Sequence, residues 1–135
     1  MGLIIDTNVF IDAENERFEL SRINRFSHYG EVYISVVTMS ELLTGIHMAK
    51  STHERVKRSA LVENILSHIP ALSITEEVAR TYAELCAYMM KSKSILKRNA
   101  HDLQIAATAI TYGYAVLTSN KVDFQKIPGV IVESP

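Results

Sequence analysis

Hydrophobic and polar positions along this chain follow two patterns, which predict strands and helices in turn. Short unbroken apolar runs, such as Leu3–Ile5, are typical of strands buried on both faces. Between these runs, apolar residues recur every three or four positions, the period of an amphipathic helix. The predicted strands cover residues 3–5, 32–37, 71–74, 115–118 and 130–132. The predicted helices cover residues 14–28, 38–49, 52–68, 75–91 and 102–112. Alternating strands and helices predict an α/β layered domain with a mainly parallel sheet.

The composition is that of an ordinary globular domain. The chain has 135 residues, of which 47% are apolar and 21% charged, so we expect a single domain over residues 1–135. No apolar run approaches the roughly 18 residues of a membrane span. We also find no secretory leader, and therefore expect a cytoplasmic protein with no membrane partner. Cys86 is the only cysteine, which excludes an internal disulfide and a cysteine-based zinc cage. We expect it to be a small buried side chain.

The net charge of −1 argues against a protein that holds nucleic acid by bulk attraction alone. If the substrate is nucleic acid, a local basic patch or bound cations must supply the positive charge. One candidate patch consists of Lys91, Lys93, Lys97 and Arg98. These residues could form a solvated helix end that complements the helix dipole, or an edge that grips phosphates. Both interpretations stay open.

Four carboxylates stand out because they occupy similar positions in the predicted layout. Asp6 ends the first strand, and Glu41 lies in the first turn of the helix after the second strand. Asp102 begins the helix before the fourth strand, and Asp123 follows that strand. Ligands bind beyond the carboxyl ends of strands in open parallel sheets. The chain has four Asp against eleven Glu, and three of those four Asp belong to this set. The short Asp side chain suits a rigid metal site.

Three of these acids have ordinary structural interpretations. Glu41 completes the pattern Thr38-x-x-Glu41 of a capping box, in which its side chain would bond the backbone at the helix start. Asp102 could cap its own helix or face the positive end of the helix dipole. Asp123 could be a solvated turn residue. Asp6 is harder to explain, because a charge at the end of a buried strand costs stability unless something pairs with it.

Together, the four acids favour a metal site. If they converge to about 5 to 6 Å, each pair repels by roughly 3 kcal/mol at an effective dielectric near 20. Capping alone would not gather such repulsion in one place, whereas a divalent cation relieves it. Oxygen-only ligands suit Mg²⁺ or Mn²⁺ rather than zinc.

The acids lie in four short segments, namely Ile5–Asn8, Ser40–Gly45, Asp102–Ala109 and Leu117–Phe124. In this order these segments resemble the PIN-domain ribonucleases, and more narrowly the VapC toxins of bacterial toxin–antitoxin pairs. The resemblance spans nearly the whole chain. It implies a PIN-like three-layer α/β/α fold with a mainly parallel central sheet. It also implies a metal-dependent endoribonuclease that hydrolyses RNA phosphodiester bonds.

The resemblance further implies a role for each acid. Asp6, Glu41, Asp102 and Asp123 are expected to be catalytic, and Asp6, Asp102 and Asp123 to hold Mg²⁺ or Mn²⁺. Asn120 stands where many relatives carry an acid, so the fourth position is divided between Asn120 and Asp123. Whether one or two metals bind therefore stays open. The resemblance also implies a homodimer, a small antitoxin that covers the active-site groove, and an RNA substrate such as transfer RNA or ribosomal RNA.

Several further residues are candidates around this site. Thr7 and Thr118 either bond the ligand carboxylates or cap the local backbone, and both interpretations stay open. Asn8, Asn120, Lys97 and Arg98 are candidates for contacts with ligands or substrate. The five histidines show no metal-ligand spacing, and His101 is expected to point away from Asp102 and to have no role. Met48, Met89 and Met90 are expected to lie in the core or a subunit interface.

Three other functions remain as alternatives. A phospho-aspartyl enzyme would also place an Asp after the first strand, but a phosphatase of that kind needs a second Asp where this chain has Asn8. A receiver domain needs a paired acid that is missing here. A non-catalytic PIN-like binding module would be expected to have lost some of its acids, whereas all four are present. A PIN nuclease of RNA processing differs from a toxin in lacking a short upstream partner gene.

Overall fold

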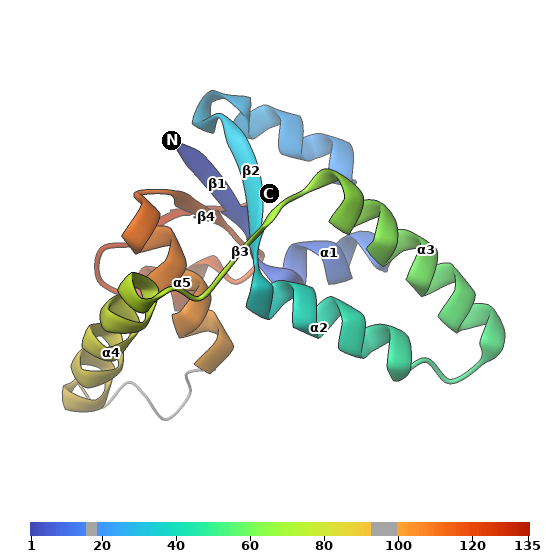
Figure 1. The fold of residues 1–135 in the computed structure, drawn as a ribbon. Helices are drawn as coiled ribbons and strands as arrows, with labels where there is room; N and C mark the ends of the chain where they lie inside the picture. Colours follow the sequence, from blue (N-terminus) through green and yellow to red (C-terminus); the bar gives the residue numbers. More distant parts are fainter. Residues whose placement is uncertain (16–18, 93–99) are drawn as a thin grey trace.

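A five-stranded parallel sheet forms the centre of the molecule (Figure 1). The structure is a computed structural model that describes residues 1–15, 19–92 and 100–135. The strands have the order β3-β2-β1-β4-β5, with Leu3 of β1 paired to Val32 on one side and Ala115 on the other. They are β1 (Gly2–Ile5), β2 (Glu31–Ser35), β3 (Ala71–Leu72), β4 (Ala115–Leu117) and β5 (Ile131–Glu133).

Helices connect the strands, and three of those that the structure describes begin with a side-chain N-cap. They are α1 (Thr7–Glu14), the 3₁₀ helix η1 (Leu20–Tyr29), α2 (Val36–His47), α3 (Thr52–His68), α4 (Glu76–Lys91), α5 (Ala100–Tyr112) and α6 (Lys121–Gln125). Ser35, Ser51 and Thr75 cap α2, α3 and α4, each accepting a hydrogen bond from a backbone N–H of the first turn. Gly113 ends α5 with a φ of 72°, as predicted.

The strands are buried on both faces, which produces the predicted three layers. Leu3 and Ile5 pack on one face of the sheet with residues from α1, η1, α2 and α3. Ile4 packs on the other face with residues from α4, α5 and α6. Figure 1 shows α4 and α5 on one side of the sheet and α1, α2 and α3 on the other. The predicted α/β/α architecture with a parallel sheet is therefore confirmed.

The strand order places a topological switch point beside β1, the position of the ligand-binding crevice in open parallel sheets. From β1 the chain moves outward through β2 to β3, and it then returns to the opposite side of β1 to form β4 and β5. The connections therefore leave the carboxyl ends of β1 and β4 in opposite directions. Ligands of open parallel sheets bind at such a reversal, because the diverging loops leave a gap there.

The first predicted helix, over residues 14–28, was wrong. The chain instead forms α1 from Thr7 to Glu14, directly after β1, and the 3₁₀ helix η1 from Leu20 to Tyr29. Val9 and Phe10 of α1 are buried, but eight residues are too few to show a helical period clearly. The five-residue α6 was missed for the same reason. The strand predicted over residues 32–37 ends at Ser35, because its cap starts α2 there.

The burial of four sulfur-containing residues matches the expectations only in part. Cys86 is half-buried rather than buried. Met89 lies in the core as predicted, whereas Met48 and Met90 are exposed. Over the described ranges, no helix is both long enough and apolar enough to cross a membrane.

Candidate active site

Asp6 is a buried carboxylate at the carboxyl end of β1, beside the crevice. Only 2% of the residue is exposed. Its backbone N–H bonds the carbonyl of Leu117 at 2.9 Å, which fixes its position against β4. Burial raises the pKa of Asp6 from 3.8 to about 6, and the negative charges of Asp102 and Glu41 add to this rise. A hydrogen bond from Thr118 acts in the opposite direction. The structure therefore brings three of the four predicted acids within electrostatic reach of one another.

Glu41 is held by a neighbouring helix and does not cap its own. The Thr7 hydroxyl donates to Glu41 Oε1 at 2.8 Å, and Thr7 also lies 3.0 Å from the Thr38 hydroxyl. The capping-box interpretation was wrong, because Ser35 caps α2 and Thr38 lies inside that helix. The Thr7 side chain thus bonds a predicted catalytic carboxylate, which is not one of the predicted metal ligands.

Asp102 is the third residue of α5, close to the start of that helix. It is half-buried. Its negative charge raises the pKa of Asp6 more than the charge of Glu41 does. It also lies near the positive end of the α5 dipole, which stabilises a negative charge. Asp102 is therefore close enough to Asp6 for its charge to raise the pKa of Asp6, and its helix packs on the face of the sheet opposite α1 and α2.

Asp123 is linked to Asp6 by a chain of hydrogen bonds. Thr118 donates to Asp6 Oδ2 at 2.8 Å and accepts from the backbone N–H of Asn120 at 2.9 Å. The side-chain amide of Asn120 donates to Asp123 Oδ2 at 2.9 Å. Thr118 is therefore both a partner of the carboxylate and a local cap, so both of its interpretations hold. Asp123 lies in the first turn of α6 and not in the expected turn, and Lys126 Nζ is 3.8 Å from its Oδ1.

His101 belongs to the site, although sequence reasoning assigned it no role. Its Nδ1 lies 3.5 Å from Glu41 Oε2, so the imidazole faces the oxygen of Glu41 that Thr7 does not bond. The prediction failed because it considered only the angle between His101 and Asp102 on one helix. The contact depends on how α5 packs against α2, which periodicity does not reveal.

The oxygen donors of this site fit a hard divalent cation by their chemistry. Carboxylates are the ligands that Mg²⁺ and Mn²⁺ prefer, and a buried acid with a raised pKa gains from a nearby cation. Among the described residues, no three His, Cys, Asp or Glu side chains already form a metal-ligand group. Asn8 is exposed on α1. Lys97 and Arg98 lie outside the described residues.

A groove opens beside Glu41 between α1, α2 and α3. It has a volume of about 310 Å³. Thr7 and Glu41 line it where it meets the acidic site, and its remaining lining is Phe10, Ile11, Glu14, Asn15, Leu42, Gly45, Arg58, Leu61, Val62 and Ile65. The groove is therefore lined by both apolar and polar side chains, and Glu41 links it to the acidic site.

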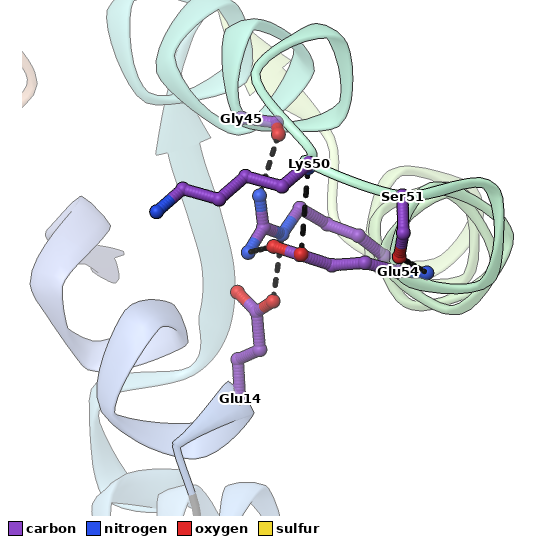
Figure 2. A network of polar contacts seen from close by, with 6 residues as sticks. Glu14, Gly45, Lys50, Ser51 and Glu54 are labelled. Carbon is purple, nitrogen blue, oxygen red and sulfur yellow. Dashed lines mark hydrogen bonds and ion pairs between the residues drawn. The ribbon is translucent and has the colours of Figure 1, made fainter.

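Arg58 joins the three helices that form this groove. Its guanidinium donates to Glu14 of α1, to Glu54 of α3 and to the Gly45 carbonyl of α2, each at 2.7 Å. Figure 2 shows Glu14 and Gly45 approaching the network from opposite sides. One side chain thus links all three walls of the groove, which also pack through their apolar residues.

Known proteins resemble this chain over nearly its whole length. The PIN domain family matches residues 3–130. Ribonuclease VapC1 of Rickettsia felis is 38% identical over 132 residues, which make up 98% of this chain and 95% of that protein.

Two solved structures have the same fold. VapBC2 from Rickettsia felis, bound to a DNA fragment from its promoter, superposes with a TM-score of 0.86 at 23% identity, covering 100% of this chain and 99% of that one. VapBC-5 from Mycobacterium tuberculosis, of the VapBC family of toxin–antitoxin systems, has a TM-score of 0.76 at 28% identity and covers 98% and 96%. The chain belongs to the PIN-domain family, in which it is a VapC-type protein.

Proposed function

We propose that this chain is the toxin of a VapBC-type pair and cleaves RNA with the help of Mg²⁺ or Mn²⁺. The observation that carries the proposal is the buried carboxylate of Asp6, whose pKa is raised to about 6 by burial and by the charges of Asp102 and Glu41. A fold gains nothing from burying a carboxylate among other acids unless a cation joins them. The kinship with VapC ribonucleases supports RNA as the substrate.

Each side chain has a distinct part in the proposed hydrolysis. Asp6 and Asp102 would hold the cation, with Asp123 or Asn120 completing the set. When bound, the cation supplies positive charge for a phosphate oxygen and lowers the pKa of a water molecule. Glu41 orients that water and takes its proton, while Thr118 fixes the Asp6 carboxylate. The products carry a 5′-phosphate and a 3′-hydroxyl. Products with a 2′,3′-cyclic phosphate would exclude this mechanism.

We further propose a small cognate antitoxin as the partner, as the VapBC complexes suggest. The groove beside Glu41, which is lined by apolar and polar side chains, is a suitable place for a segment of that antitoxin, because Glu41 is one of the proposed catalytic acids. We also propose that the protein works in the cytoplasm as a homodimer, and that transfer RNA or ribosomal RNA is its target.

The proposal is tested by inducing the wild-type chain and Asp6→Asn in cells and mapping new RNA 5′ ends. Wild type should arrest growth and produce new 5′-phosphate ends, and Asp6→Asn should do neither. New ends in both cultures, or in neither, would contradict the proposal. A second test is independent of catalysis: Mg²⁺ should raise the Tm of purified wild type, and should raise that of Asp6→Asn much less.

A further inference from the structure

Three oxygen atoms next to the catalytic crevice form a short chain. The Thr38 hydroxyl lies 3.0 Å from the Thr7 hydroxyl, which lies 2.8 Å from Glu41 Oε1. Thr38 and Glu41 are three residues apart and therefore share one face of α2. Thr7 approaches from α1 and lies between them.

Each hydroxyl has one proton to donate, and this decides which group donates and which accepts in the two hydrogen bonds. An ionised carboxylate only accepts hydrogen bonds, so Thr7 must donate its single hydroxyl proton to Glu41. The contact between the two threonines then requires that Thr38 donate to the oxygen of Thr7. A hydroxyl that accepts one bond donates a stronger second bond, because the two polarise each other. Thr38 therefore strengthens the hold of Thr7 on Glu41.

Thr38 differs from other threonines in the helices of this protein. Thr44, Thr108 and Thr111 each donate to the backbone carbonyl four residues earlier, which is the usual bond of a helical threonine. The side chain of Thr38 instead bonds across to α1. Thr38 is 0% exposed, where a valine of the same shape would fill the space without a polar atom to satisfy.

We propose that Thr38 is a positioning residue that orients the Glu41 carboxylate through Thr7. This inference rests on the proposed role of Glu41 as the group that orients and deprotonates water. The Glu41 side chain is 32% exposed and has several rotatable bonds, so it needs external bonds to hold one conformation. Thr7 fixes Oε1 and His101 faces Oε2, which leaves the carboxylate plane defined from both sides.

The test compares Thr38→Val with Thr38→Ser in the full-length protein. Valine keeps the shape but removes the hydroxyl, whereas serine keeps the hydroxyl. With an oligoribonucleotide that spans the strongest mapped cleavage site, Thr38→Val should lower kcat by about tenfold to a hundredfold with little change in KM. Thr38→Ser should retain most of the wild-type rate. Thr108→Val is the matched control, since it removes another fully buried helical hydroxyl and should leave kcat unchanged.

A double-mutant cycle shows whether the effect passes through Glu41. Adding Thr38→Val to Glu41→Gln should cause no further loss of rate, because the group being oriented has already been changed. A crystal structure of Thr38→Val should show the Glu41 side chain turned away from Thr7 or in several rotamers. Thr38→Ser should keep the single conformation.

Three results would overturn the proposal. They are a folded Thr38→Val with the wild-type kcat, an equal further loss in the Glu41→Gln background, and an unchanged Glu41 conformation in the crystal. If Thr38→Val does not fold, Thr7→Val interrupts the same chain and should show the same fall in kcat, and a wild-type rate in that variant would equally refute the role. A wild-type rate in Glu41→Gln would instead show that the proposed mechanism itself is wrong.

Discussion

At the scale of single residues, Asp6 carries the largest energetic consequence. It is buried at the end of a strand and lies among other acids, so its ionised form is disfavoured in the folded protein without a cation. The Thr118 hydroxyl offsets only part of this cost. A buried residue whose ionised form lowers the stability of the free protein is typical of a functional site.

Asp6→Asn should therefore stabilise the metal-free protein, in a manner that depends on pH. Between pH 4 and pH 6 the folded wild type keeps a proton on Asp6 that the unfolded chain has lost, so wild-type stability falls as the pH rises through this window. A pKa raised from 3.8 to about 6 corresponds to roughly 3 kcal/mol above pH 6. Urea unfolding with a chelator should show Asp6→Asn more stable by up to that amount at pH 8.

The control is the difference between the two proteins at low pH. Near pH 4 the advantage of Asp6→Asn should nearly vanish, because the carboxyl group is then protonated in the folded wild type. An advantage of the same size at pH 4 and pH 8 would show that titration of Asp6 is not its cause.

At the scale of elements, one guanidinium links α1, α2 and α3, which also pack through a shared apolar cluster. Arg58 bonds all three helices, and its side chain is only 23% exposed. Truncation would leave the Glu14 carboxylate and the Gly45 carbonyl without this donor. Polar groups that lose a partner in a half-buried place cost more than the bond itself contributed.

Arg58→Met should destabilise the protein by about 1 to 3 kcal/mol, measured as the free energy of urea unfolding. Arg80→Met is the matched control, because Arg80 bonds only Glu76 one turn away and its side chain is 75% exposed. That exposed pair should contribute about 0.5 kcal/mol or less. Equal losses in the two variants would show that the bonds of Arg58 to α1 and α2 contribute little.

The sequence predicted elements with a long, regular pattern and missed those without one. The apolar runs of β1, β2 and β4 were correctly identified because strands buried on both faces need continuous apolar residues. The eight-residue α1 and five-residue α6 show too few turns for a period to be visible. The helix predicted over residues 14–28 joined the polar end of α1 to the apolar positions of η1.

The site was predicted in part for similar reasons. The sequence placed Asp6 at a strand end and Glu41 and Asp102 at helix starts, and the fold brings these three acids into electrostatic reach. The partners of these acids were harder to predict. His101 and Thr38 reach the site only through the angles at which α5, α1 and α2 pack, and those angles depend on the whole core.

At the scale of the whole molecule, an acidic site has to receive a polyanion. The net charge is −1, so we expect local basic residues, together with the proposed cation, to attract the substrate. The basic segment that precedes Asp102 is the candidate, and Lys97 and Arg98 within it lie outside the described residues. Their proposed role follows from charge and position in the chain.

Reversing both charges, in Lys97→Glu with Arg98→Glu, should weaken RNA binding and reduce its dependence on salt. The slope of log affinity against log salt concentration should fall by roughly 1 to 2, because two phosphate contacts to a single strand are lost. Filter binding in a Ca²⁺ buffer would measure this slope, with Asp6→Asn present in every protein so that the RNA is not cleaved. Arg55→Glu with Lys57→Glu, two exposed changes on α3, is the control and should leave the slope near that of the parent.

The proposed antitoxin site predicts that a residue lining the groove and an exposed residue outside it differ in their effect on antitoxin binding. Ile11 lines it and is 41% exposed, so Ile11→Glu should weaken antitoxin binding by at least about tenfold in calorimetry. Val56 on α3 is 64% exposed and does not line the groove, so Val56→Glu should bind normally. Equal affinities for the two variants would place the antitoxin elsewhere.

The bond between Thr118 and Asp6 joins residues 112 positions apart and depends on the pairing of β4 with β1. A nascent chain cannot form this bond until β4 has emerged from the ribosome. Closing so long a loop comes late in folding, because its entropy cost must be met by contacts already formed. Asp6 therefore gains its Thr118 partner only after β4 has been translated and has paired with β1, so the carboxylate is not held in this way while the chain contains only β1, β2 and β3.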